Sequence, residues 1–255
     1  MAIGVPRLGA AVSKTTGTTL SVPYPVGADA PVAGDYLLII FGQNVNTMSA
    51  VPAGWTDAYS RATGGTTTPV LRIYTRRAVG GETGTVACTT PISNTQGRMV
   101  VLSGVDETTP LDVAVQLYET TALAVHLIVP SFNTVTAGTT LLGVALHNSN
   151  TGGWTPPTNP AQWTELHDSP VVNPKMEIAY LGGVAPGPTG AIDFWATGSL
   201  RGLAAVLTLR PVVSASVSRA KRWTGSAWVD APVQRWSGSA YVDATVKRWD
   251  GSAWV

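Results

Sequence analysis

The chain has 255 residues, a hydrophobic share of 44%, a charged share of 12% and a formal net charge of +1. Globular domains usually carry about 25% charged residues, and disordered chains are rich in charge and poor in apolar residues. The composition therefore predicts a packed core in one large or two small domains. The small net charge argues against a nucleic-acid partner, because an electrostatic binder needs a dense basic face to displace counterions.

Cysteine usage and the apolar runs restrict the class further. Cys88 is the only cysteine, so no disulfide can form within the chain. Residues 1–7 show no basic segment followed by an apolar one, which argues against a signal peptide. The longest apolar runs, such as 36–41, are far too short to span a bilayer. We therefore expect no membrane partner and a protein made and kept in the cytoplasm.

Turn residues and short apolar runs predict an all-β chain. With 27 Gly and 18 Pro, many turns are available to separate short strands. Alternating and continuous apolar runs both indicate strands, whereas no long helical stripe is present. In the first half of the chain the predicted strands are 36–41, 71–75, 86–88 and 99–102.

Each of these segments has a counterpart about 105 residues further along the chain. The segment PAGWTD at 52–57 matches PAQWTE at 160–165, although Gln162 replaces Gly54 at the turn. An ordered series of such matches predicts an internal duplication, with halves of about 1–115 and 116–211. The predicted strands of the second half are 140–145, 176–180, 192–194 and 203–209.

The expected architecture of residues 1–211 is an internally duplicated antiparallel β-sandwich, jelly-roll-like in its connections. We favour one sandwich shared by both halves, because about 100 residues with five or six strands make a thin core alone. Two small sandwiches are the alternative. Trp55 and Trp163 occupy equivalent places in the two halves, so we expect both to have the same packing role.

The C-terminal part, residues 212–255, has a different organisation. After a linker it repeats every 13 residues, as RWTGSAWVDAPVQ from Arg222, RWSGSAYVDATVK from Arg235 and RWDGSAWV from Arg248. Glycine at the first central position is typical of a two-residue type II′ hairpin turn. We therefore predict three short hairpins that turn at their Gly-Ser pairs. In that register the opposed aromatic pairs are Trp223/Trp228, Trp236/Tyr241 and Trp249/Trp254.

These six aromatic residues are the candidate binding or subunit-contact site. Cross-strand aromatic pairs contribute roughly 0.2–1 kcal/mol each, and an isolated hairpin is marginal in water. The hairpins must therefore stack on each other, on the rest of the chain or on another subunit. Structural stacking or subunit contact is the favoured role, and binding of cell-wall glycan is the alternative. We also expect a homo-oligomer, with a trimer as one form.

The residues that could carry chemistry are few. His126, His147 and His167 are dispersed, and we interpret them as solvated or core histidines. The acids in the segment 106–112 are interpreted as a polar turn between the halves, with a cation or catalytic site as the alternative. Cys88 alternates towards the core and should be an inert apolar side chain.

No catalytic constellation, metal site or cofactor site is therefore predicted, and we expect the protein not to be an enzyme. A polysaccharide hydrolase would need a pair of positioned carboxylates. The adjacent Arg76 and Arg77 are expected to be a solvated pair at the end of a strand.

Residues 1–211 resemble a loose family of β-sandwich proteins of actinobacterial phages and bacteria. The resemblance depends on AGD at 33–35 before an apolar strand, PAGW at 52–55, VVLSGVD at 100–106, PLD at 110–112 and LTLRP at 207–211. The repeated RWxGSAWV motif is similar to C-terminal repeats of phage minor tail and fibre proteins. The resemblance supplies no catalytic residues.

The resemblance implies a virion protein that is assembled in the host cytoplasm and acts as a minor tail or tail-fibre component in host attachment. Its partners would be other virion proteins and, through the aromatic repeats, host cell-wall glycan. The alternatives are a capsid decoration or head-fibre protein and a cell-wall glycan-binding module.

Overall fold

The chain forms two compact units, Met1–Val212 and Val213–Val255, which we call the body and the tail. Strands account for 56% of the residues, and the described part contains a single 3-10 turn, Gly27–Asp29, and no α-helix. The predicted all-β class is therefore confirmed. The computed structural model describes residues 2–44, 50–61, 69–90, 94–148, 153–169, 174–212, 220–226, 228–231 and 234–243.

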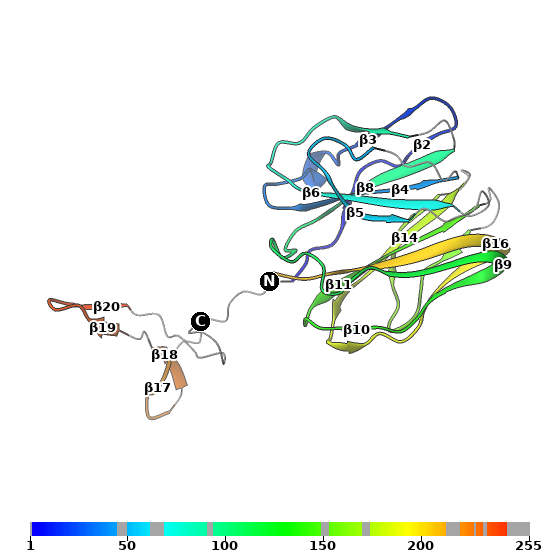
Figure 1. Cartoon of the computed structure of the whole chain (residues 1–255). Helices are drawn as coiled ribbons and strands as arrows, with labels where there is room; N and C mark the ends of the chain where they lie inside the picture. The colour runs from blue at the N-terminus through cyan, green and yellow to red at the C-terminus, as the bar shows by residue number, and fades with distance from the viewer. Residues whose placement is uncertain are drawn as a thin grey trace. The chain divides into compact units, whose positions relative to one another are not determined.

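Two large antiparallel sheets form the centre of the body (Figure 1). The first sheet contains, in spatial order, β1 (Arg7–Leu8) and β2 (Val12–Lys14), which both pair with β8 (Thr95–Leu102), then β4 (Tyr36–Gln43), β6 (Val70–Arg77) and β5 (Thr56–Arg61). The second contains β9 (Gln116–Val129) and β12 (Trp154–Thr155), which both pair with β16 (Ile192–Leu209), then β11 (Thr139–His147), β14 (Lys175–Val184) and β13 (Thr164–Asp168).

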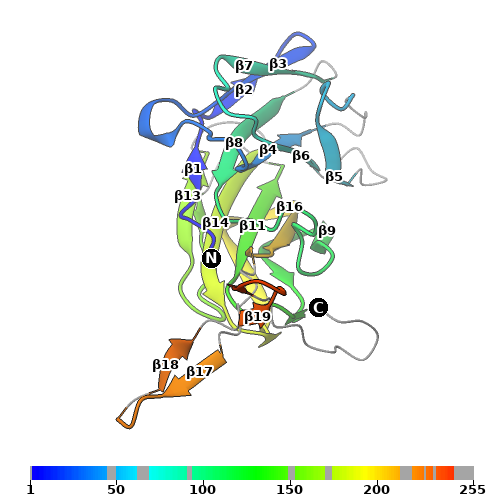
Figure 2. The same cartoon turned by 90° about the vertical axis from the view of Figure 1, so that its left-hand side faces the viewer.

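Two smaller strand pairs complete the body. Strand β3 (Thr19–Pro23) pairs with β7 (Thr85–Thr89), and β10 (Asn133–Thr134) pairs with β15 (Gly187–Pro188). Figure 2 shows β3 and β7 at the end of the body that lies beyond the first sheet. Leu20 and Val22 of β3 and Cys88 of β7 are buried against that sheet.

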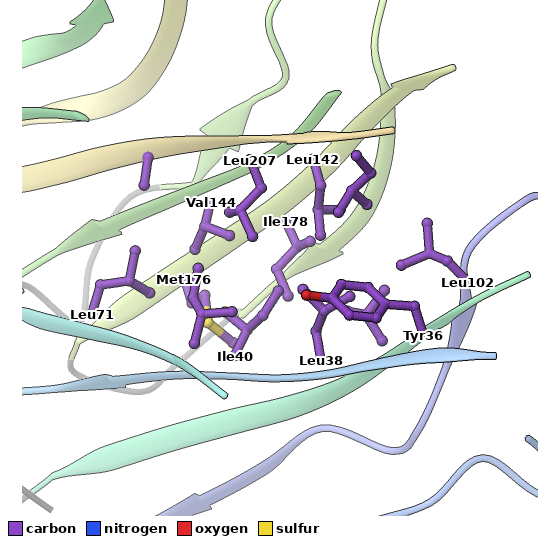
Figure 3. Packing of buried hydrophobic residues seen from close by; sticks show 14 of the residues in the cluster. Tyr36, Leu38, Ile40, Leu71, Leu102, Leu142, Val144, Met176, Ile178 and Leu207 are labelled. Atoms are coloured by element: carbon purple, nitrogen blue, oxygen red, sulfur yellow. The ribbon is translucent and has the colours of Figure 1, made fainter. Parts of the chain in front are cut away.

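The central core lies between the two large sheets (Figure 3). Leu38 and Ile40 of β4 point towards Val144 of β11 and Ile178 of β14 in this layer. The intervening residues of β4 point to the opposite face, because successive side chains of a strand alternate. Both faces of β4 are buried, so its sequence is a continuous apolar run and not an alternating one.

Each sheet also covers a core of its own on the side away from the other sheet. In the first half, Leu37 and Phe41 of β4 pack with the β3–β7 pair. In the second half, Leu127 and Val129 of β9 and Phe194 of β16 pack against the outer face of the second sheet. The body is therefore four layers deep: the two halves share a central core, and each half also has a core of its own between two layers.

The two sheets have the same order of strands. Spatial order β5-β6-β4-β8 in the first sheet corresponds to β13-β14-β11-β16 in the second, and each series follows the same sequence along the chain. Both edge strands also carry an irregularity at the same place, between Asp57 and Tyr59 and between Glu165 and His167. A duplicated half would produce this correspondence. The duplication itself stays a prediction.

Trp55 and Trp163 lie immediately before the edge strands β5 and β13, and each is buried in the core of its own half. Trp163 contacts Phe194 edge-on, with ring centroids 6.1 Å apart. These rings leave no space for a side chain at Gly143 of β11, where an added Cβ would lie 2.4 Å from Phe194 Cζ. The expected packing role therefore agrees with the burial of both tryptophans.

Candidate functional site

The described part of the tail contains two hairpins. Strand β17 (Ala220–Trp223) pairs with β18 (Trp228–Ala231), and β19 (Gln234–Trp236) pairs with β20 (Tyr241–Asp243). The backbone register places Trp223 opposite Trp228 and Trp236 opposite Tyr241. These are the pairs that were predicted for hairpins turning at the Gly-Ser positions. The third pair, Trp249 and Trp254, lies outside the described residues.

The glycines of the two turns adopt a conformation that other residues rarely do. Gly225 has φ of +100° and Gly238 has φ of +102°, in the region that favours glycine because it lacks a Cβ. In the second hairpin the Ser237 N–H donates to the Ala240 carbonyl over 2.8 Å. The Ala240 N–H donates to Ser237 Oγ over 3.1 Å, so a side chain replaces one of the two backbone bonds expected of a tight two-residue turn.

Trp236 is the one tail aromatic whose side-chain exposure is described, and 58% of its surface is accessible. A large apolar side chain in this state on a small hairpin is a potential contact surface. Whether the six candidate aromatics bind a ligand or another subunit stays a prediction.

The body carries an exposed tryptophan that the sequence analysis did not single out. Trp195 of β16 is 45% exposed and lies opposite His126 of β9 in the strand register. The signal was present in the sequence: Ile192 and Phe194 alternate into the core, which turns Asp193 and Trp195 outward. Trp195 is therefore a candidate contact residue, because tryptophan is enriched at binding surfaces.

The acids between the two halves are engaged by the backbone. Asp106 Oδ1 accepts hydrogen bonds from the Thr108 and Thr109 N–H groups at 3.0 and 2.8 Å. These bonds, with that from Thr109 the largest effect, lower the pKa of Asp106 to about 2. Asp112 accepts from the N–H groups of Val135 and Thr136 at 2.6 and 3.0 Å. The two carboxylates thus shape separate turns, in agreement with the polar-turn interpretation.

The remaining residues considered for chemistry are dispersed as expected. His147 and His167 are buried, and burial lowers the pKa of each to about 4. Burial also raises the pKa of the Cys88 thiol to about 12, which keeps it protonated. Among the described residues no group of three or more His, Cys, Asp or Glu side chains has a geometry that could hold a metal ion.

The expectation that Arg76 and Arg77 are a solvated pair is wrong. Arg76 donates to Glu82 Oε1 at 3.1 Å, and its guanidinium carbon lies 5.3 Å from the centre of the Trp55 ring. Arg77 lies over Tyr36 and donates to the carbonyls of Val105 and Asp106. The two side chains point to opposite faces of β6, and each fixes a different part of the first half.

Comparisons with known proteins give no relatives. No family model matches the chain, and no similar curated protein or solved structure is found. The described residues include no helix of the length and apolarity that a membrane-spanning segment requires.

Proposed function

We propose that the protein is a non-catalytic attachment protein of a bacteriophage particle, a minor tail or tail-fibre component in which the body is a scaffold and the tail makes contacts. The observation that carries this proposal is the separate tail unit, with its hairpins and the exposed Trp236. Hairpins of this size cannot bury their aromatic side chains alone. They would therefore be stabilised by binding to a partner surface.

The repetition of the aromatic motif supports attachment. Linked copies of a weak contact bind with an effective concentration set by the linker, so three modest contacts can give firm attachment. The similarity of the RWxGSAWV motif to repeats of phage minor tail and fibre proteins supports a place on a virion. A capsid decoration or head-fibre protein would make its contacts through the same aromatic hairpins of the tail.

The second candidate function is a cell-wall glycan-binding module. Flat aromatic rings stack on the apolar faces of sugar rings, and Trp236 offers such a ring to solvent. The two candidates differ in what the tail contacts: another virion protein in the first, and the host surface in the second.

A triple substitution of Trp228, Tyr241 and Trp254 by alanine tests the role of the tail. We expect phage that carry this variant to lose incorporation of the protein if the aromatics contact other virion proteins. Normal incorporation with reduced adsorption to host cells would assign the aromatics to glycan binding. Retention of both incorporation and adsorption would remove the tail from the function altogether.

The matched control changes the same three repeats without removing an aromatic ring. Ser226, Ser239 and Ser252 follow the turn glycines, and their replacement by alanine should leave incorporation and adsorption unchanged. Quantitative immunoblots of purified particles report incorporation, and the loss of unadsorbed phage over time reports adsorption.

A further inference from the structure

The outer layer of the second half is a strand pair with one buried and one exposed face. Its strands are the segments 126–129 of β9 and 192–195 of β16. Leu127 and Phe194 point inward to the core of this half. The outward-facing side chains alternate with these inward ones. The packing of this layer therefore depends on its inner face alone. That face is thus available for another function.

Two nearly parallel, stacked rings lie on this outer face. Trp195 and His126 are direct cross-strand neighbours, their ring centroids are 6.4 Å apart, and their planes differ by only 15°. Ile128, 41% exposed, lies beside them on β9. Thr155 of β12 is the neighbour of Trp195 on its other side. We call these residues with Asp193 the aromatic patch.

The two polar members of the aromatic patch, His126 and Asp193, are hydrogen-bonded to each other. His126 Nδ1 donates a hydrogen bond of 2.7 Å to Asp193 Oδ2, and the two side chains are 49% and 41% exposed. Because Asp193 occupies Nδ1, Nε2 is the ring nitrogen of His126 that remains for a ligand. The patch therefore combines an exposed aromatic surface with polar groups at its edge.

We propose that the aromatic patch binds a neutral pyranose ring of a polysaccharide. Such a ring has an apolar C–H face that matches the exposed indole of Trp195, and hydroxyl groups at its edge. His126 and Thr155 are the cross-strand neighbours of Trp195 on its two sides. In the proposed complex His126 Nε2 and the Thr155 hydroxyl hydrogen-bond to the sugar hydroxyls. Trp195 contributes contact area with little loss of side-chain entropy, as tryptophan does at other binding surfaces.

Two other occupants fit the patch less well. A nucleobase would also stack on Trp195, but nucleic acid needs Lys or Arg side chains for its phosphates. The patch contains neither, and its His126 is hydrogen-bonded to the carboxyl group of Asp193. A second copy of the chain would have to bury the His126–Asp193 pair, which costs free energy unless its remaining hydrogen bonds are satisfied. The proposal concerns the body alone, so it does not rest on the proposed role of the tail.

An NMR titration of the full chain tests the proposal. The indole N–H resonance of Trp195 is identified by its loss in the Trp195→Phe variant. The probes are cellohexaose, chitohexaose, maltohexaose and xylohexaose, with a thymidine dodecanucleotide as the nucleic-acid probe. We expect the Trp195 resonance to shift with at least one oligosaccharide, with a Kd on the order of 1 mM or tighter.

The variants separate binding from folding. Because both Trp195 variants lack the indole resonance, their binding is followed by the backbone amide resonances of His126 and Thr155, the cross-strand neighbours of residue 195. Trp195→Ala should weaken binding about tenfold or more, and Trp195→Phe should restore part of it because an aromatic face remains. His126→Ala should weaken binding through the lost hydrogen bond. The control is Val79→Ala, which removes another exposed apolar side chain, 80% accessible, from the first half. All variants should keep the melting temperature of the wild type, because none of these side chains belongs to a core.

Four results would overturn the proposal. They are a Trp195 resonance unmoved by every oligosaccharide, a shift caused only by the oligonucleotide, a shift that depends only on protein concentration, and wild-type affinity in Trp195→Ala. The third result would assign the patch to contact between copies of the chain. Because the readout is the resonance of Trp195, a residue of the body, these results are distinct from failure of the tail experiment.

Discussion

Glu177 is a carboxylic acid in the interior of the second half. Its side chain is fully buried, and no described residue donates a hydrogen bond to either of its oxygens. Burial, with smaller effects from Glu165 and Asp168, raises its pKa to about 9. Asp168 is its direct neighbour on β13, and Lys175 precedes it on the same face of β14. Glu177 is therefore protonated and uncharged at neutral pH.

Replacement of Glu177 by glutamine should change the pH dependence of stability. Between pH 4.5 and about 9 the folded state holds a proton on Glu177 that the unfolded state releases. Each pH unit in this interval lowers the free energy of unfolding by about 1.4 kcal/mol. Glu177→Gln removes that slope, so it should gain about 2 kcal/mol relative to wild type between pH 6.5 and 8. Urea unfolding at several pH values measures the difference.

The buried histidines give the opposite slope at lower pH. His147 and His167 have pKa values of about 4 in the fold against 6.5 in the unfolded chain, so stability is lost as pH falls from 6.5 towards 4. Wild type should therefore be most stable near pH 6.5. Glu107→Gln, in the exposed turn between the halves, is the control and should follow wild type. Parallel curves for Glu177→Gln and wild type would contradict this account.

Gly143→Ala tests the packing of the second half. The new Cβ would lie 2.4 Å from Phe194 Cζ and 2.9 Å from Trp163 Cζ3. Both rings are buried and cannot move aside easily, so overpacking should cost about 1–3 kcal/mol of stability. Gly182→Ala on β14 is the matched control, because its nearest neighbour would be 3.7 Å away. Urea unfolding of both variants measures the costs, and equal stabilities would show that the Trp163–Phe194 contact adapts.

At the residue scale, the sequence predicted which side chains point to the core where apolar residues alternate along a strand. The burial of Cys88 followed from such a pattern, whereas the packing role of Trp55 and Trp163 was predicted from their equivalent places in the two halves. Glu177 was not predicted, because a glutamate within the segment 175–184 looks like an ordinary surface position until a second layer covers it. The contacts of Arg76 and Arg77 were also not predicted, because they depend on how the chain folds: Glu82 turns back onto Arg76, and Val105 and Asp106 come to Arg77 from beyond β8.

At the scale of elements, β9 and β16 each run through two layers of the second half, whereas each of these layers has its own strands in the first half. The N-terminal part of β9 pairs within the second sheet, and its C-terminal part forms the outer layer. In the first half separate strands take these positions. Strands β2 and β8 pair within the first sheet, and β3 and β7 pair in the outer layer. The register of β9 with β16 shifts between Trp195 and Gly202, and such irregularities bend strands and turn them from one layer to the next.

Gly238→Val tests the conformation of the second tail hairpin. Valine at φ of +102° is strained, so the hairpin should lose about 1–3 kcal/mol and open locally. The body should melt at the wild-type temperature, because body and tail are separate compact units. Limited proteolysis measures the opening of the tail, and Ser239→Ala is the control at the neighbouring position. A cleavage rate equal to that of wild type would contradict the turn assignment.

The elements were predicted best where apolar runs are long. The runs at 36–41 and 203–209 became β4 and the C-terminal part of β16. The great length of β16 was not predicted, because Gly198 and Gly202 look like a break between two strands. Strand β3 was also missed, since Thr19–Pro23 has only two inward apolar residues.

At the scale of the whole molecule, the described part of the body contains three apolar cores. The central core joins the halves, and each half has a further core beneath its outer layer. The sequence could not place these layers, because the apolar pattern of β4 shows that both faces are buried but not which strands cover them. Order along the chain does not determine which sheet faces which.

Deletion of residues 213–255 should separate folding from association. The body contains all three described cores, so we expect the truncated protein to keep the melting temperature of the full chain. We expect the full chain to form a homo-oligomer and the truncated chain to associate more weakly, because the aromatic hairpins are lost. Light scattering measures both masses. A monomeric full-length protein would contradict the expected homo-oligomer.

The most direct measurement of the central claim is quantitative mass spectrometry of purified phage particles, followed by antibody labelling in the electron microscope. The proposed attachment function predicts this chain in intact particles at a fixed copy number, with label on the tail or its fibres. Label on the capsid would favour the decoration or head-fibre alternative. Detection of the protein in lysates of infected cells, and its absence from purified particles, would contradict the account.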